Sequence, residues 1–222
     1  MNTTIRMCLA LALVCVLKLT YAQSEREKYL QVITERSDKI IAQLGDLDRE
    51  KYAEARAIVV RQYDLLNSHH EARDGKIKQL KDTYGGRPAL LEEKRDELER
   101  KEDSVLRVLH ADFLHKLGQV LTPKQIDQVK DGMTYGVLPL TYKAYQEMIP
   151  QLTEAQKAQI FSYLIEAREL AMDAPGSKEK HGVFGKYKGR INNYLSKEGY
   201  DLKEEGKKWE ERRAKAKVDT KS

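Results

Sequence analysis

The sequence has very little cysteine, and what it has lies at one end. The only two cysteines among the 222 residues are Cys8 and Cys15, both inside an apolar N-terminal stretch. The rest of the chain therefore has no disulfide and no cysteine-based metal site. Side-chain packing has to supply its stability.

Long apolar runs are also missing, apart from the one between Met7 and Leu17. That run is too short for a transmembrane helix, which needs about 20 apolar residues. Arg6 precedes the run and Thr20-Tyr21-Ala22 follows it with a small residue at the end, which is the layout of a secretory signal. We therefore expect a signal peptide at residues 1–22, a periplasmic or secreted protein, and no membrane span after the signal.

The third absence is that of strand patterns. No segment alternates apolar and polar residues in the way typical of a half-buried strand. Apolar residues instead recur at spacings of three and four through most of the chain, which indicates amphipathic helices. We expect an all-α fold, an elongated helical bundle that forms a single domain over residues 23–222.

Start and stop signals divide the first half of the chain into three helices. The first, over 24–44, ends at Gly45. Asp48 can cap a much longer second helix, and Gly85-Gly86-Arg87-Pro88 separates that helix from a third of similar length. Apolar residues repeat along both long helices at the spacing of helices that pack on each other. This predicts an antiparallel helix hairpin over about 48–118.

Shorter helices are expected over about 123–173. Two of them begin at related sequences, Leu121-Thr-Pro-Lys-Gln125 and Leu152-Thr-Glu-Ala-Gln156, in which threonine and glutamine can form a capping box. After Pro175 the glycine spacing predicts a basic loop over about 175–190. C-terminal helices over about 191–217, with the single tryptophan Trp209, complete the expected fold.

Positive charge is concentrated near the C-terminus. The formal net charge is +5, or +3 without Arg6 and Lys18 of the leader. From Gly176 onward the chain has 14 Lys and Arg against 8 Asp and Glu. This asymmetry favours an anionic partner for the last third of the chain, and a solvated helical tail is the alternative.

Polar residues replace apolar ones on one side of the second helix. Tyr63, Asn67, His70 and Asp74 are spaced four, three and four apart, and Arg73 takes the next position of the apolar stripe. Asp74 lies one turn from His70 and could orient its imidazole as a catalytic acid or base. The alternative is a satisfied polar layer that fixes the register of the hairpin.

The expected basic loop is the second candidate site. Its glycines do not match a phosphate-binding loop, so nucleotide binding is not indicated. Cations beside aromatic rings and amides can bind carboxylates, sulfates and sugar rings. The alternative is a surface loop whose aromatics pack on the bundle. The candidate ligand-binding residues in and after the loop are Lys186, Tyr187, Lys188, Arg190, Asn192 and Asn193.

Signatures of enzymes and metal sites are not found. There is no nucleophile elbow and no His-Glu-x-x-His pattern. His70 with Asp74 would supply only two metal ligands, and His110 and His115 are five residues apart. We predict no metal, no cofactor and no nucleic-acid partner. His69, which points away from the stripe, is expected to be exposed.

Two long motifs give the sequence a family resemblance. The segments YDLLNSHHEARDGKIKQLK and GKYKGRINNYLSKEGYDLKEEGKKWEER, together with the leader, resemble secreted domains of unknown function from Bacteroidota. Those domains are often associated with polysaccharide-utilisation gene clusters. The resemblance covers nearly all of the chain after the leader and implies a role around complex glycans, without implying catalytic residues. The paired Leu-Thr-x-x-Gln boxes are also similar to those of Spy-type periplasmic chaperones.

Three hypotheses for function follow. The first is a non-enzymatic exported protein that binds an anionic partner such as an acidic glycan through the basic segment. The second is an enzyme that acts on acidic polysaccharide, with His70 as acid or base. The third is a periplasmic chaperone-like protein.

Overall fold

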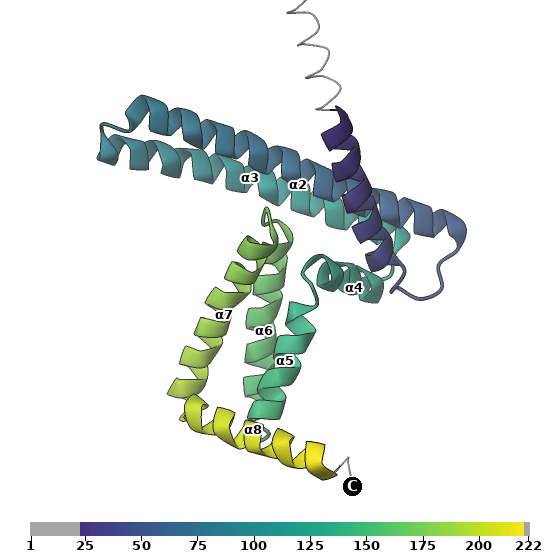
Figure 1. Cartoon of the computed structure of the whole chain (residues 1–222), viewed down its shortest axis with the longest axis vertical. Coiled ribbons are helices and arrows are strands. Elements are labelled where there is room, and N and C mark those ends of the chain that lie inside the picture. The colour runs from purple at the N-terminus through teal and green to yellow at the C-terminus, as the bar shows by residue number, and fades with distance from the viewer. Residues whose placement is uncertain (1–22, 220–222) are drawn as a thin grey trace, which may run out of the picture.

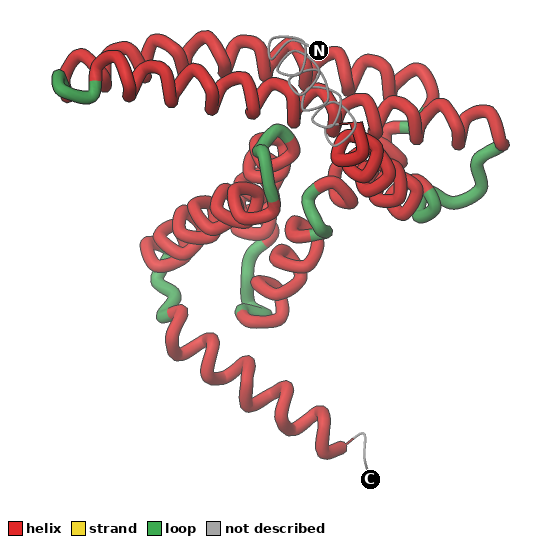
Figure 2. Tube along the Cα trace, turned by 45° about the horizontal axis from the view of Figure 1, so that its top comes forward, coloured by secondary structure: helices red, strands yellow, loops and turns green. Residues whose placement is uncertain are grey.

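Every regular element of the structure is a helix. The structure, a computed structural model, describes residues 23–219, with side chains through residue 216, and contains no strand in that range (Figure 1, Figure 2). This confirms the all-α prediction, while the predicted signal peptide lies outside the described residues. An N-terminal helix over 23–41 is followed by α2 (Arg49–Tyr84), α3 (Pro88–Val120), α4 (Pro123–Met133), α5 (Val137–Met148), α6 (Glu154–Met172), α7 (Ser177–Lys197) and α8 (Leu202–Asp219).

Helices α2 and α3 form the predicted hairpin and lie side by side along their length (Figure 1). Asp48 caps α2 by accepting a hydrogen bond from the backbone N–H of Lys51 at 2.9 Å, and Pro88 begins α3. The N-terminal helix crosses the hairpin and buries Ile41 against it. Beyond this crossing, the outer part of the hairpin over residues 71–101 contains no buried residue. None of the described helices is both long and apolar enough to cross a bilayer.

A second layer of helices extends away from the hairpin. Helices α5, α6 and α7 run alongside one another, and α8 crosses their far ends (Figure 1). Both predicted capping boxes are formed, with Thr122 and Gln125 beginning α4 and Thr153 and Gln156 beginning α6. The buried apolar residues form two clusters, one around the hairpin and the other among α5, α6 and α7.

The predicted basic loop over 175–190 is wrong, because this segment is most of helix α7. Glycine in a helix costs about 1 kcal/mol relative to alanine, and α7 contains three glycines. However, Phe184, Ile191 and Leu195 recur at helical spacing and are almost fully buried against the second cluster. That burial outweighs the poor helix propensity. The break between helices comes later, where Gly199 has a φ of +94°, and the last helix begins after it at Leu202, within the range expected for the C-terminal helices.

The turn between α4 and α5 has an unusual backbone. Tyr135 has a φ of +61°, and it is the only non-glycine residue with positive φ in the described chain. It occupies the position after a helix at which glycine is favoured, since the N–H of Gly136 bonds to the carbonyl of Asp131 at 2.8 Å. A left-handed conformation costs a non-glycine residue about 1–2 kcal/mol.

The C-terminal end of α6 docks against the hairpin, and we call this contact the junction. Met172, the last residue of α6, belongs to the hairpin cluster. Lys180 of α7 is buried there, and its Nζ donates to the carbonyls of Met172 at 3.0 Å and Met133 at 3.3 Å. The junction therefore fixes how the two layers are joined.

Candidate functional site

The polar residues predicted on α2 do not form one cluster. Tyr63 is buried beneath the guanidinium of Arg36, and burial raises the pKa of Tyr63 to about 12. Asn67 donates to Glu71 on the same helix at 2.9 Å. The structure therefore separates these side chains between the core and the helix surface.

The predicted pairing of His70 with Asp74 is wrong. His70 is only 5% exposed, and its Nε2 lies 2.7 Å from the backbone carbonyl of Asp173, whereas its Nδ1 is buried without a hydrogen-bond partner. The Asp74 side chain is 67% exposed and pairs with Arg73 at 3.0 Å. Burial lowers the pKa of His70, so the neutral imidazole donates from Nε2. His70 therefore bonds to the residue that follows α6 and not to Asp74.

His69 was expected to be exposed, and this expectation is also wrong. Its side chain is 7% exposed, and its Nδ1 lies 3.5 Å from the carboxylate of Glu102 on α3. Lys76 also reaches Glu102, at 2.7 Å. The hairpin therefore contains a polar layer, as the alternative interpretation of the sequence predicted. Its histidine is His69 and not His70. Val105, three residues after Glu102 on α3, is 45% exposed.

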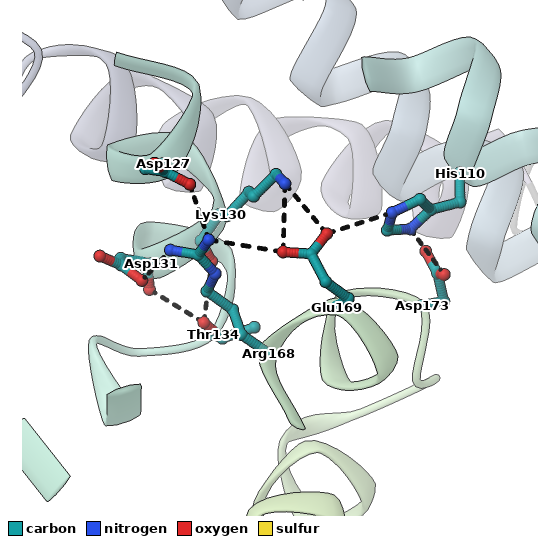
Figure 3. Close-up of polar contacts among 8 residues, drawn as sticks. All are labelled: His110, Asp127, Lys130, Asp131, Thr134, Arg168, Glu169 and Asp173. Carbon is teal, nitrogen blue, oxygen red and sulfur yellow. Dashed lines mark hydrogen bonds and ion pairs between the residues drawn. The ribbon is translucent and has the colours of Figure 1, made fainter. Parts of the chain in front are cut away.

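A larger charged network lies at the junction and was missed by sequence reasoning (Figure 3). His110 of α3 contacts Asp173 at 2.9 Å through Nδ1 and Glu169 at 3.3 Å through Nε2. Lys130 of α4 donates to the same Glu169 at 3.0 Å. Hydrogen bonds therefore connect the hairpin, α4 and the end of α6.

Arg168 extends this network across α4. Its side chain is 7% exposed and donates to Asp131 at 2.9 Å and to Asp127 at 2.6 Å (Figure 3). Asp127 and Asp131 are one helical turn apart, so both carboxylates reach one guanidinium. The spacing of these two aspartates on one face of α4 was the signal available in the sequence. The partners lie 37 and 41 residues apart, which no local pattern connects.

The network has defined protonation states. Hydrogen bonds to Asp173 and then to Glu169 raise the pKa of His110 to about 9. Burial alone would raise the pKa of Glu169, but hydrogen bonds from His110 and Lys130 hold it at about 2. Both groups are therefore charged near neutral pH. Among the described residues, no group of three or more His, Cys, Asp or Glu side chains is placed to hold a metal ion.

The predicted basic residues lie on the outer half of α7, away from the junction. Arg190 follows Lys180 by ten residues, which is about 15 Å of helix. The hairpin motif and the basic motif therefore belong to separate places and do not form one pocket. Lys186, Lys188, Arg190, Asn192 and Asn193 are exposed, and Tyr187 is half-buried.

Two of these residues line a groove between α5, α7 and α8, which we call the α5/α7/α8 groove. Lys188 and Asn192 share it with Trp209, and its volume is about 460 Å³. The hydroxyl of Tyr145 donates to Oδ1 of Asn192 at 2.7 Å, which leaves the Asn192 amide nitrogen as a donor. Leu140, at the groove, is 67% exposed.

The position of α8, which carries Trp209, is set by its neighbours. Arg212 donates to the carbonyls of Glu147 and Met148, at 2.9 and 3.0 Å, at the end of α5. Arg213 lies 5.0 Å from the centre of the Trp209 ring. Arg212 therefore fastens α8 to the end of α5, next to the groove that the Trp209 ring lines.

Arg190 is already engaged within α7 and α6. Its guanidinium lies 4.8 Å from the centre of the Tyr187 ring, and it pairs with Glu166 at 3.5 Å. Lys186 and Lys188 form no ion pair within the described residues. Of the predicted cations, Lys188 is therefore the one that lines the groove without an ion-pair partner within the described residues.

The fold and these sites define an all-helical protein whose described part has a partly buried charged junction and a solvent-facing groove lined by apolar and cationic residues. The family model of DUF3826, described as a protein of unknown function, matches residues 30–216, and the chain belongs to this family. No curated protein matches the chain.

Proposed function

We propose that the protein is exported and binds an acidic glycan in the α5/α7/α8 groove without catalysing a reaction on it. The observation that carries the proposal is that Lys188, Asn192 and Trp209 line the same groove. These residues come from the segment in which positive charge is concentrated. Export and a role around complex glycans belong to the proposal, as the leader and the motif resemblance suggest.

Each lining residue suits one part of an acidic sugar. The Trp209 ring offers a flat apolar surface for the C–H face of a sugar ring, and the Asn192 amide nitrogen can donate to a hydroxyl. The Lys188 ammonium supplies charge for a carboxylate or sulfate. A volume of about 460 Å³ is within the range of small-ligand sites and holds a short stretch of a chain.

The site on α2 gives no support to the competing hypothesis of catalysis. A general acid or base has to come within hydrogen-bond reach of its substrate. His70 is buried and is bonded to a backbone carbonyl. Its expected partner Asp74 is engaged with Arg73 at the surface.

Calorimetric titration with polygalacturonate and with a sulfated glycosaminoglycan tests the proposal. We expect Trp209→Ala to weaken binding about tenfold or more, because an aromatic platform in a binding site is worth more than 1.4 kcal/mol. Lys188→Ala should weaken binding about fivefold and reduce its sensitivity to salt, because one charge contact is lost. Lys178→Ala, which removes an exposed cation elsewhere on α7, is the matched control and should bind like the wild type.

Equal affinity of the wild type, Trp209→Ala and Lys188→Ala would overturn the proposal, as would equal affinity for a neutral glycan. If instead no glycan binds and the protein suppresses the aggregation of an unfolded client, the chaperone-like hypothesis takes its place.

A further inference from the structure

A second groove lies at the other end of α5, between the N-terminal helix, α4 and the α4–α5 turn. Its volume is about 520 Å³, and we call it the Tyr135 groove. The residues that matter for its chemistry are Arg36, Lys39, Gln43, Gln128, Asp131 and Tyr135. The proposed function does not use this groove.

Tyr135 lies at the groove in a backbone conformation that is unfavourable for a non-glycine residue. Glycine is preferred at this position after a helix, yet the chain places a tyrosine there with a φ of +61°. The side chain is not needed for the core, because Tyr135 is 42% exposed. Its ring stacks on His181 of α7, with centroids 5.4 Å apart and planes 25° apart. A strained backbone that presents an exposed, fixed ring indicates a use for the ring, because strain of this kind gathers at functional sites.

The charge of the groove is positive. Arg36 and Lys39 lie one turn apart on the N-terminal helix. The Arg36 guanidinium also lies 5.5 Å from the centre of the Tyr63 ring and has no carboxylate partner within the described residues, and Lys39 forms no ion pair there. The only carboxylate among the six residues, Asp131, is already paired with Arg168 at 2.9 Å. The side-chain amides of Gln43 and Gln128 add polar groups suited to hydroxyls. An aromatic ring, a cation and a side-chain amide are the kinds of chemical group that also line the α5/α7/α8 groove, which has one cation, Lys188, and one amide, Asn192.

We propose that the Tyr135 groove is a second binding site for an acidic sugar unit, with Tyr135 as the platform and Arg36 and Lys39 as the cations. The inference deepens the proposed function and rests on it. Pro139 lines the Tyr135 groove, and the next residue, Leu140, lines the α5/α7/α8 groove. Both sites therefore border α5, so one polymer chain can occupy both and gain affinity from two-point attachment.

Stoichiometry with a short ligand tests the inference separately from the proposed function. We use a uronic-acid trisaccharide, and in a parallel arm a sulfated disaccharide, because carboxylate and sulfate share this chemistry. The wild type is expected to bind two short ligands per chain. Tyr135→Gly and Lys39→Ala should each leave one strong site, as should Trp209→Ala, whereas Lys178→Ala should keep both.

Tyr135→Gly separates loss of binding from loss of folding. Glycine adopts positive φ without strain, so the variant should keep or raise its melting temperature while the second site weakens at least fivefold. Binding of long polygalacturonate should weaken at least tenfold in either single-site variant, because two-point attachment is lost.

Three results would overturn the inference: a single site per chain in the wild type that Trp209→Ala removes, two sites retained in both Tyr135→Gly and Lys39→Ala, or no binding in either arm. If Trp209→Ala changes nothing while Tyr135→Gly abolishes all binding, the proposed α5/α7/α8 groove fails and the Tyr135 groove stands alone.

Discussion

His70 and His110 lie on the two helices of the hairpin and contact the same residue, Asp173, in different protonation states. His70 meets the backbone carbonyl, and burial lowers its pKa, so it is neutral. His110 meets the carboxylate together with that of Glu169, and its pKa rises to about 9. Burial therefore keeps His70 neutral although its carbonyl contact favours the proton, whereas two carboxylates outweigh burial and keep His110 charged.

The raised pKa of His110 predicts that part of the stability is lost in mild alkali. The folded state holds a proton that the unfolded chain releases near pH 6.5, so this contribution is fully present below pH 6.5 and disappears as the pH rises to about 9. We expect a loss of about 1–2 kcal/mol, less than the full shift implies, because water reaches part of the network. The buried Lys180, whose pKa burial lowers to about 8, acts in the opposite sense above pH 8. The clean window is therefore pH 6.5 to 8.

Urea denaturation at several pH values measures this contribution. His110→Gln should flatten the decline between pH 6.5 and 8. His115→Gln, at an exposed histidine on the same helix, should retain it. An unchanged slope in His110→Gln would show that the decline arises elsewhere.

Single residues were predictable from the sequence where their partners are local. The caps at Asp48, Thr122 and Thr153 depend on residues three positions away, and all three are formed. The fates of His70 and His110 depend on the end of α6, 103 and 63 residues further along the chain. No spacing within α2 or α3 contains that information.

At the scale of elements, α7 shows how packing overrides propensity. Its three glycines and its lysines predicted a loop, but its apolar residues are spaced for a helix that α6 covers. The hairpin was predictable because its apolar stripe and its Gly-Gly-Arg-Pro turn agree. The apolar spacing of α7 was the signal that deserved more weight than its glycines.

Two glycines in helices are expected to respond to alanine in opposite directions. A Cβ at Gly185 of α7 would meet no atom within 4 Å, so Gly185→Ala should stabilise the protein by about 0.5–1 kcal/mol through helix propensity. A Cβ at Gly132 of α4 would lie 2.9 Å from side-chain carbons of the buried Ile40. Gly132→Ala should therefore destabilise by about 1–3 kcal/mol, because α4 has to move from the N-terminal helix.

Thermal unfolding of the two variants beside the wild type checks this prediction. A melting temperature that rises for Gly132→Ala would mean that α4 and the N-terminal helix are less tightly packed than described.

At the scale of the whole molecule, two apolar clusters meet across a charged junction. Arg168 bonds to two carboxylates of α4, and Glu169 beside it connects to Lys130 and His110. Ionic contacts of this kind depend on geometry more than apolar contacts do. They therefore fix the angle between the hairpin and the helices α5 to α7.

Removing the central guanidinium should loosen this connection. Arg168→Met leaves Asp131 without its partner, and we expect a loss of about 2–3 kcal/mol, below the value for fully buried pairs because Asp127 is largely exposed. Amide hydrogen exchange should show faster opening in α4 and at the end of α6. Arg190→Met, which removes an exposed ion pair, is the control and should change stability by less than about 0.5 kcal/mol. Equal effects of the two substitutions would contradict the role given to the junction.

The outer hairpin, in which no residue from Glu71 to Lys101 is buried, has a mechanical consequence. Helix α2 continues 14 residues past His70, which is roughly 20 Å of rise. Anything bound at the tip of the hairpin would therefore lie about that far from the junction. A force applied at the tip would act on α2 and α3 before it acts on either apolar cluster.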